Sequence, residues 1–135
     1  MTTWRPGWDD VPPTLLEFWT ERHLCTLATL RADGSPHVVP VGVALDVEER
    51  CAWVITNASS RKASQVAADG RVAACQFDGA RWSTIEGTAL VRADEASVDR
   101  AVARYAARYR TPRPNPQRVA LRIEVDRFLV SAGLV

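Results

Sequence analysis

The stretch at residues 24–45 constrains the fold more than any other, because two strand-like runs there flank a strong turn signal. In the first run, residues 24–30, neither alternating face is strongly polar, which predicts a strand buried on both sides. The turn that follows offers Asp33 as a cap, Gly34 for a positive φ and Pro36 to fix φ on the return. The stretch therefore predicts a β-hairpin.

The returning run of the hairpin, residues 37–45, is almost wholly apolar but contains Pro40 and Gly42, which a regular central strand excludes. A ligand could explain both, because backbone groups left unpaired beside Pro40 could meet the edge of a flat polar heterocycle. A bulge at the corner of a barrel is at least as good an explanation.

Length and charge limit the class of protein. The 135 residues are expected to form a single domain, residues 1–135, and a formal net charge of +1 gives no overall attraction to nucleic acid or to an anionic membrane. No run approaches the roughly 20 apolar residues of a membrane span, and residues 1–10 lack a signal-peptide core. Cys25, Cys51 and Cys75 are isolated in apolar runs, which indicates reduced, buried thiols. We therefore expect a cytoplasmic protein.

The remaining patterns predict a mostly β chain with flanking α-helices. Strand patterns lie at residues 24–30, 37–45, 51–56, 71–78, 81–92 and 118–129, and helical patterns begin at Pro12, Ser59 and Asp94. Because most of the strands follow one another through hairpin connections, we expect a small six-stranded antiparallel barrel rather than a parallel sheet. The first helix is expected to cover the barrel as a lid.

A basic helix start follows the third strand pattern, in the sequence T-N-A-S-S-R-K-A-S at residues 56–64. Arg61 and Lys62 oppose the helix dipole there, at a cost of roughly 0.3–1 kcal/mol each. A bound anion would reverse the sign of this effect, and the hydroxyls of Ser59 and Ser60 could also contact a phosphate. A solvated basic turn explains the same residues equally well.

Familiar catalytic motifs are absent from the sequence. It contains no G-x-x-x-x-G-K-[ST], no G-x-G-x-x-G, no G-x-S-x-G and no Cys or His pairs at metal-binding spacing, so we expect neither a catalytic side-chain nucleophile nor a metal site. His23 and His37, the only imidazoles, each precede a hairpin strand, where a structural role is more common than a catalytic one.

The order of these motifs resembles a known family. The hairpin T-L-R-A-D-G-S-P-H-V-V-P-V, the S-S-R-K helix start and the strand G-A-R-W-S-T-I-E-G-T-A resemble the split β-barrel flavin and deazaflavin proteins of the pyridoxamine-phosphate-oxidase-like superfamily. The ending Y-A-A-R-Y-R-T-P-R-P-N-P-Q-R-V is similar to its mycobacterial deazaflavin-dependent biliverdin reductases. This resemblance implies an FMN-binding type of split barrel, coenzyme F-420, and a homodimer with cofactor clefts between subunits. The implied reaction is hydride transfer from the reduced deazaflavin, reducing biliverdin, a tetrapyrrole, to bilirubin.

The resemblance also implies site residues. The deazaflavin ring would be lined by the backbone of His37, Val38, Val39, Pro40 and Val41, although Pro40 removes one donor from this strand. Ribityl and phosphate oxygens would be held by Thr56, Asn57, Ser60, Arg61 and Lys62. Gln76, Arg81 and Trp82 would approach the cofactor from either subunit.

On the substrate side, Arg113 and Arg118 lie in or after the proline-rich loop T-P-R-P-N-P and could contact the two propionates of biliverdin. No Asp, Glu or His is a compelling proton donor. Two alternatives to the deazaflavin reductase remain open. One is an FMN-dependent oxidase or reductase of the same fold, and the other is a protein that binds a cofactor or tetrapyrrole without turnover.

Overall fold

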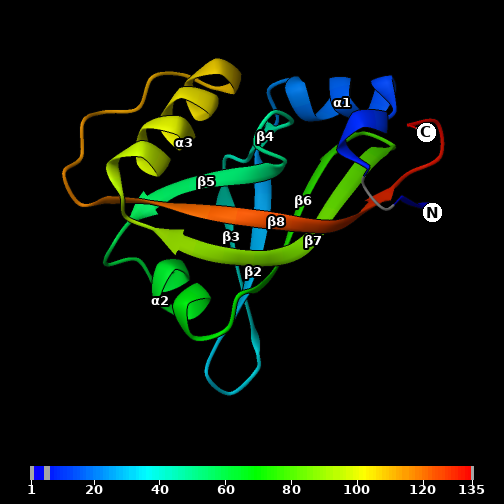
Figure 1. Ribbon diagram of the computed structural model, residues 1–135. Helices are drawn as coiled ribbons and strands as arrows, with labels where there is room; N and C mark the ends of the chain where they lie inside the picture. Colours follow the sequence, from blue (N-terminus) through cyan, green and yellow to red (C-terminus); the bar gives the residue numbers. More distant parts are fainter. Residues whose placement is uncertain (1, 5–6, 135) are drawn as a thin grey trace.

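The computed structural model describes residues 2–4 and 7–134, and its strands curl into one sheet with helices around it (Figure 1). The strands are β1 (Thr2–Trp4), β2 (Cys25–Leu30), β3 (Pro36–Val41), β4 (Ala44–Asp46), β5 (Cys51–Asn57), β6 (Arg71–Asp78), β7 (Arg81–Arg92) and β8 (Arg118–Val130). The helices are α1 (Pro13–Thr20), α2 (Arg61–Ala68) and α3 (Glu95–Arg108), with a 3-10 turn, η1 (Trp8–Asp10). A mostly β chain with flanking helices is therefore confirmed.

The sheet is antiparallel throughout, in the order β3-β2-β6-β7-β8-β5-β4, and β1 pairs with β8 beside this path. The strand predicted at residues 37–45 is in fact two strands, β3 and β4, separated by Gly42 and Val43. These strands are the two ends of the order, so two residues tie one edge of the curled sheet to the other. With seven strands on the path, and no ladder between β3 and β4 in the described residues, a six-stranded barrel is not confirmed.

The predicted hairpin turn is confirmed in detail. The Arg31 N–H donates to the Ser35 carbonyl at 2.9 Å, and Gly34 between them has a φ of 85°. The Asp33 carboxylate accepts from the backbone and the hydroxyl of Ser35, at 2.9 and 2.6 Å. The turn thus uses the three properties that its residues offer: a capping oxygen, a left-handed glycine and a proline that begins β3.

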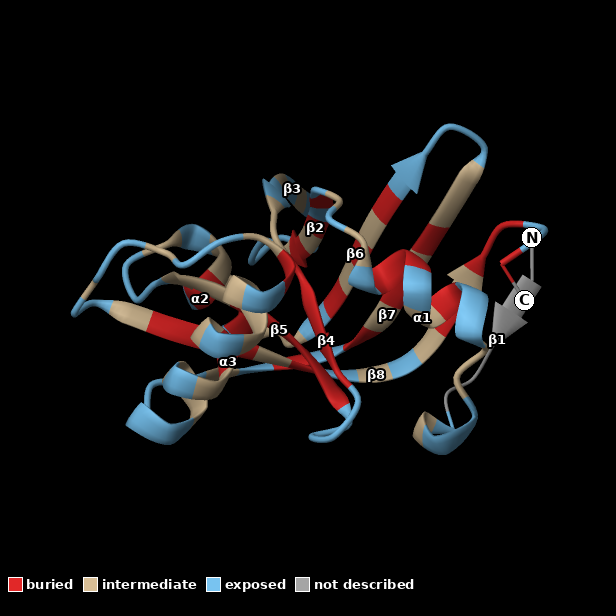
Figure 2. Ribbon diagram, turned by 90° about the horizontal axis from the view of Figure 1, so that it is seen from above, coloured by how far each residue is buried: buried red, intermediate tan, exposed pale blue. Residues whose placement is uncertain are grey.

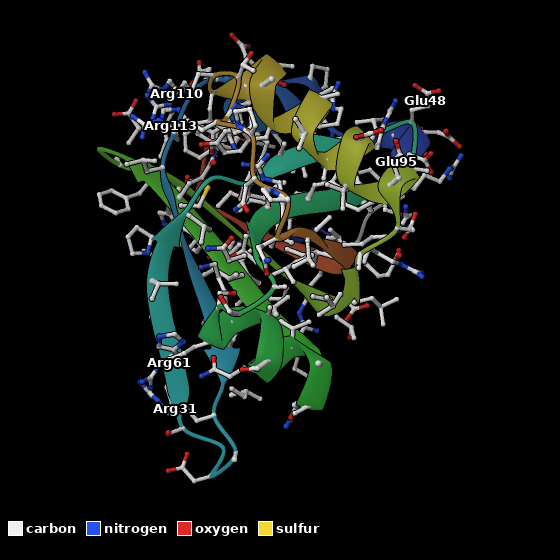
Figure 3. The ribbon with its side chains drawn as sticks, turned by 90° about the vertical axis from the view of Figure 1, so that its left-hand side faces the viewer. Arg31, Glu48, Arg61, Glu95, Arg110 and Arg113 are labelled. Carbon is white, nitrogen blue, oxygen red and sulfur yellow. The ribbon has the colours of Figure 1, made fainter. Side chains whose placement is uncertain are left out.

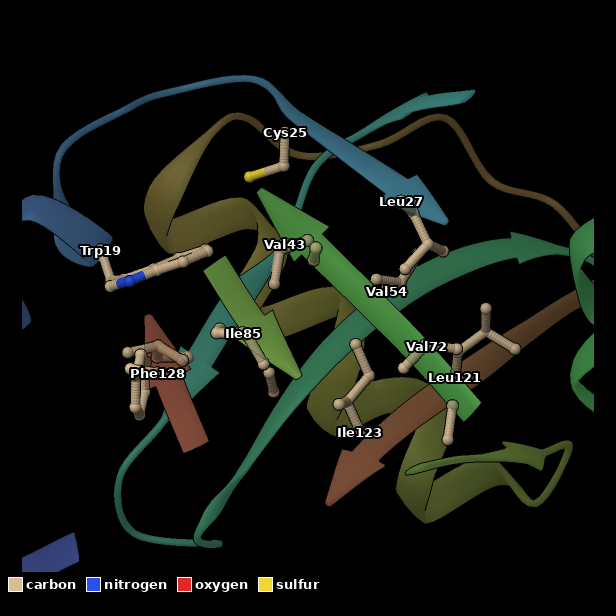
Figure 4. Packing of buried hydrophobic residues seen from close by; sticks show 14 of the residues in the cluster. Trp19, Cys25, Leu27, Val43, Val54, Val72, Ile85, Leu121, Ile123 and Phe128 are labelled. Carbon is tan, nitrogen blue, oxygen red and sulfur yellow. The ribbon is translucent and has the colours of Figure 1, made fainter. Parts of the chain in front are cut away.

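Inward-facing side chains of β2, β5, β7 and β8 fill the inside of the sheet, among them Leu27, Val54, Ile85 and Leu121 (Figure 4). The helix α1 contributes a stripe of fully buried residues to the same cluster, namely Leu15, Phe18 and Trp19. The indole N–H of Trp19 donates to the Ser83 hydroxyl on β7 at 3.0 Å. The first helix therefore packs onto the core through the apolar stripe that its sequence predicts.

The helix α3 packs against the other face of β4, β5 and β8. Arg100 donates two 2.7 Å hydrogen bonds to the Asp46 carboxylate on β4, and one turn later Arg104 donates to the Leu45 carbonyl at 2.9 and 3.2 Å. Burial alone would raise the pKa of Asp46, but hydrogen bonds from Arg100 and Trp53 lower it to about 2. Arginines of α3 therefore fasten the helix to the edge strand β4.

No helix in the described part of the chain is long and apolar enough to cross a membrane. The three thiols are free, and Cys25 and Cys51 are buried while Cys75 is half-buried. The prediction of buried thiols is therefore confirmed for two of the three.

Candidate cofactor and substrate site

The N-terminus of α2 carries two cations and no acid. The Ser60 hydroxyl caps the helix by accepting from the Ala63 N–H at 3.2 Å. Arg61 is exposed, Lys62 is half-buried, and neither pairs with a carboxylate among the described residues. Because both charges oppose the helix dipole, they destabilise the helix unless an anion lies beside them. This end of α2 therefore has the charge and donors of a phosphate site.

The next turn of α2 is tied to both strands of the hairpin. The side-chain oxygen of Gln65 accepts from the Thr29 hydroxyl at 2.5 Å and from His37 Nδ1 at 2.9 Å. An amide oxygen only accepts, so Nδ1 of His37 carries the ring proton in this contact. These bonds fix the distance between the basic helix start and β3, and they give the His37 ring a structural role.

The strand β3 forms an open edge, because β2 is its one partner among the described strands. Along an antiparallel pair of strands, hydrogen-bonded and non-hydrogen-bonded residue pairs alternate, and the Arg31–Ser35 hydrogen bond sets which is which. The peptide groups of His37, Val39 and Val41 therefore bond to β2, while those of residues 36, 38 and 40 point outward. Pro40 therefore removes no ladder hydrogen bond. Between the two prolines, Val38 provides the outward N–H of this edge.

The proline-rich loop that follows α3 reaches the start of α2. The Asn115 side chain donates to the side-chain oxygen of Asn57 at 2.5 Å, and the Ala58 N–H donates to the Gln117 carbonyl at 2.8 Å. Thr56 is the residue before Asn57 on β5, so the loop lies beside the predicted ribityl and phosphate contacts.

The two predicted substrate arginines have different roles in this loop. The Arg118 guanidinium donates to the Arg113 carbonyl at 2.7 Å and so holds the loop in place. Arg113 is exposed and pairs with no carboxylate among the described residues. Figure 3 shows Arg110 and Arg113 at one end of the β3 side of the molecule and Arg31 and Arg61 at the other. Cationic groups therefore flank the open edge at both ends.

Gln76 does not belong to this site. Its side chain is fully buried, its amide N–H donates to the Phe18 carbonyl at 2.9 Å, and its amide oxygen accepts from Arg108 at 2.6 Å. Both ends of the amide are used inside the core, so we withdraw the prediction that Gln76 contacts the cofactor.

The turn between β6 and β7 lies at the end of this hairpin that is far from α2 (Figure 2). Arg81 and Trp82 are the first two residues of β7, next to this turn. The strand β6 starts just after α2 and has 8 residues. At 3.3 Å per residue, its far end lies more than about 20 Å from its start beside α2. Arg81 pairs with Asp78 at 2.6 Å and with Glu21 at 3.3 Å. Within one chain these two residues therefore lie away from the basic start of α2.

Sequence reasoning assigned no role to two residues that hold the site together. Gln65 follows Arg61 by four residues, so helical spacing places both on one face of α2. This spacing could have identified Gln65 from the sequence. Asn115 meets Asn57 across a gap of 58 residues, and no local pattern indicates that contact.

Most of the chain is similar to a known protein family and to a known enzyme. Residues 11–131 match the pyridoxamine 5'-phosphate oxidase family. A biliverdin reductase from Mycobacterium tuberculosis (strain CDC 1551 / Oshkosh) that depends on reduced coenzyme F-420 is 50% identical over 120 residues, which cover 89% of this chain and 88% of that protein.

Two solved structures have the same fold. A conserved hypothetical protein from Mycobacterium tuberculosis superposes with a TM-score of 0.73 at 26% identity, over 87% of this chain and 81% of that one. An F-420 reductase superposes with a TM-score of 0.66 at 22% identity, over 84% and 94%. The resemblance indicated by the hairpin and the helix start is therefore confirmed, and the chain belongs to the pyridoxamine 5'-phosphate oxidase family.

Proposed function

We propose that this chain is an oxidoreductase that uses reduced coenzyme F-420 to reduce biliverdin to bilirubin. The observation that carries the proposal is the 50% identity, over 89% of the chain, to a biliverdin reductase that depends on this coenzyme. The 120 matched residues are most of the 135 in the chain, so the match is not confined to one motif.

The start of α2 would hold the phosphate of the coenzyme. Arg61 and Lys62 stand there without a carboxylate partner in the described residues, and the first turn contains no acid. A phosphate would receive charged hydrogen bonds from both side chains and would lie at the positive end of the helix dipole. Ser60, Thr56 and Asn57 add polar groups beside it for ribityl oxygens.

The open edge of β3 would contact the deazaflavin ring through its peptide groups. Val38 offers an outward N–H and C=O, and Pro40 offers a carbonyl without a competing N–H. Because hairpin bonds to β2 and the Gln65 bond to His37 hold this strand, these groups are oriented before the ring binds.

When bound, reduced coenzyme F-420 supplies the hydride. The residues of the chain bind and orient the substrate: Arg113 would contact a propionate of biliverdin, and Arg118 would keep the loop in position through its bond to the Arg113 carbonyl. We assign no side chain as proton donor, and the proton would come from solvent or from the protonated substrate.

We further propose a homodimer. Val38 and Phe77 are 56% and 71% exposed, and the register places Val38 in one outward-facing row with the small residues Ala28 and Ala73. An apolar sheet face of this kind is typical of a surface covered by a partner. In such a dimer, Arg81 and Trp82 could reach the cofactor site of the second copy.

Titration of the purified protein with coenzyme F-420 and, separately, with FMN tests the proposal. We expect the deazaflavin to bind more tightly, and reduced deazaflavin to be consumed as biliverdin becomes bilirubin. Turnover with FMN instead would support the flavin-dependent alternative. Binding of deazaflavin without oxidation of its reduced form would support a carrier, and either result would contradict the proposal.

A further inference from the structure

The last turn of α3 holds the end of β3. Gly42, the residue after this strand, lies against the rings of Tyr105 and Tyr109, whose centroids are 5.0 Å apart and whose planes are tilted by 30°. A Cβ atom on Gly42 would lie 2.7 Å from Tyr105 Cε2 and 2.9 Å from Tyr109 Cε2. A side chain at position 42 would therefore displace the two rings, because they occupy the volume that its Cβ atom needs.

The next peptide unit is bonded to the same helix turn. The Val43 N–H donates to the Tyr109 hydroxyl at 3.2 Å, and the Val43 carbonyl accepts from Arg108 at 2.5 Å. The Tyr109 hydroxyl donates in turn to the His23 carbonyl, just before β2, at 2.5 Å. Burial raises the pKa of Tyr109, so its hydroxyl keeps the proton that it donates.

The bonds of Arg108 extend this connection into the core. Its guanidinium also donates to the Glu21 carbonyl at 2.8 Å and to the Gln76 side chain at 2.6 Å. The residues that end α3 are thus fixed to α1, to β6 and to the link between β3 and β4. The chain leaves this fixed point at Arg110 and enters the loop that carries Arg113.

We propose that Tyr109, supported by Arg108, is a positioning residue for hydride transfer. It sets the end of the cofactor strand β3 relative to the loop that holds the substrate, and the inference rests on the proposed function for the identity of those two ligands. The last turn of α3 contacts the end of β3 and leads directly into the loop that contains Arg113. A displacement of this turn would therefore change the distance between coenzyme and substrate more than it changes the contacts of either ligand.

The test compares Tyr109→Phe with the matched control Tyr105→Phe. Both variants keep the ring pair against Gly42, but only Tyr109→Phe removes a hydroxyl that has protein partners among the described residues. For Tyr109→Phe we expect kcat with biliverdin to fall by roughly tenfold or more, with the Kd of coenzyme F-420 and the KM of biliverdin nearly unchanged. Amide exchange at Val43 should accelerate, and Tyr105→Phe should resemble the parent in every measurement.

Equal kcat in the two variants would overturn the inference. So would a parallel loss of kcat, coenzyme affinity and Tm in Tyr109→Phe, because that pattern describes general damage to the fold. If Tyr109→Phe does not fold, Gly42→Ala, which displaces the same rings, is judged by the same criteria. A parent protein without turnover contradicts the proposed function and this inference together, whereas an active parent with an unaffected Tyr109→Phe contradicts this inference alone.

Discussion

Arg108 donates a 2.6 Å hydrogen bond to the side-chain oxygen of Gln76, 32 residues away, and both side chains lie inside the fold. The guanidinium also packs over the Trp19 ring at 5.4 Å and pairs with no carboxylate among the described residues. Its donors go to carbonyl and amide oxygens, which disperse the charge without a counterion. Gln76 thus provides a side-chain acceptor for the buried guanidinium inside the core.

Substitution of Gln76 should therefore cost stability. Gln76→Leu removes the side-chain acceptor of Arg108 and should lower the free energy of unfolding by about 1–3 kcal/mol in urea denaturation. Gln117→Ala, at an exposed side chain, is the control and should change little. A Gln76→Leu protein with parental stability but weakened coenzyme binding would instead show that Gln76 contributes to the cofactor site.

Removal of the two cations at the start of α2 should weaken coenzyme binding. Each lost charged partner costs about 1.5–3 kcal/mol, so Arg61→Ala combined with Lys62→Ala should raise the Kd of coenzyme F-420 at least roughly 10- to 150-fold in a fluorescence titration. Arg92→Ala, an exposed arginine at the end of β7, should leave the Kd unchanged. An unchanged Kd in the double variant would refute the phosphate assignment.

Arg113 should act on substrate affinity alone. Because its side chain is exposed and pairs with no described carboxylate, Arg113→Ala should raise the KM for biliverdin while coenzyme affinity and Tm stay near parental values. Arg22→Ala, at an exposed position just after α1, serves as the control in the same steady-state assay. An earlier melting transition with unchanged KM would show that the residue serves the loop and not the substrate.

Asp46 should make the fold sensitive to acid. Its pKa is lowered from 3.8 to about 2, so its charge contributes stability that is complete above 3.8 and is lost as the pH falls through about 2. The difference corresponds to about 2 kcal/mol. In urea unfolding at a series of pH values, the free energy of unfolding of Asp46→Asn should fall less at low pH than that of the parent. The exposed Asp10→Asn should follow the parent curve, and identical curves for all three proteins would contradict the prediction.

The proposed dimer should depend on the exposed face of β6. The chain has a mass of 14.9 kDa, and sedimentation of the parent at micromolar concentration should give twice that value. Phe77→Glu places a charge on this face and should yield the monomer with weaker coenzyme binding. Leu90→Glu, at another exposed apolar residue, on β7, should remain dimeric. A parent that sediments as a monomer would exclude the homodimer.

Local patterns predicted most of the elements. Alternation and the Asp78-Gly79 turn gave the bounds of β6 and β7 as they are observed, and Pro40 with Gly42 indicated where the long strand divides. The six-strand count failed because that division produces two strands on opposite edges of the sheet. The short strand β1 has no pattern of its own and exists through pairing with β8.

The site was only partly predictable, for a related reason. The basic start of α2 departs from helix preference within a few residues, so the sequence reveals it. The Asn57–Asn115 contact joins distant segments, and only the fold brings them together. Gln76 could have been placed correctly, since Val72 and Ala74 alternate with it on the inward face of β6.

The two prolines of β3 also bear on the behaviour of the protein in concentrated solution. An unpaired edge strand can recruit a strand from another molecule, which is a common first step in aggregation. Pro36 and Pro40 leave the outward side of β3 with a single N–H between them, at Val38, so an incoming strand finds too few donors to form a continuous ladder. The edge can thus offer peptide groups to a small ring while resisting the growth of an intermolecular sheet.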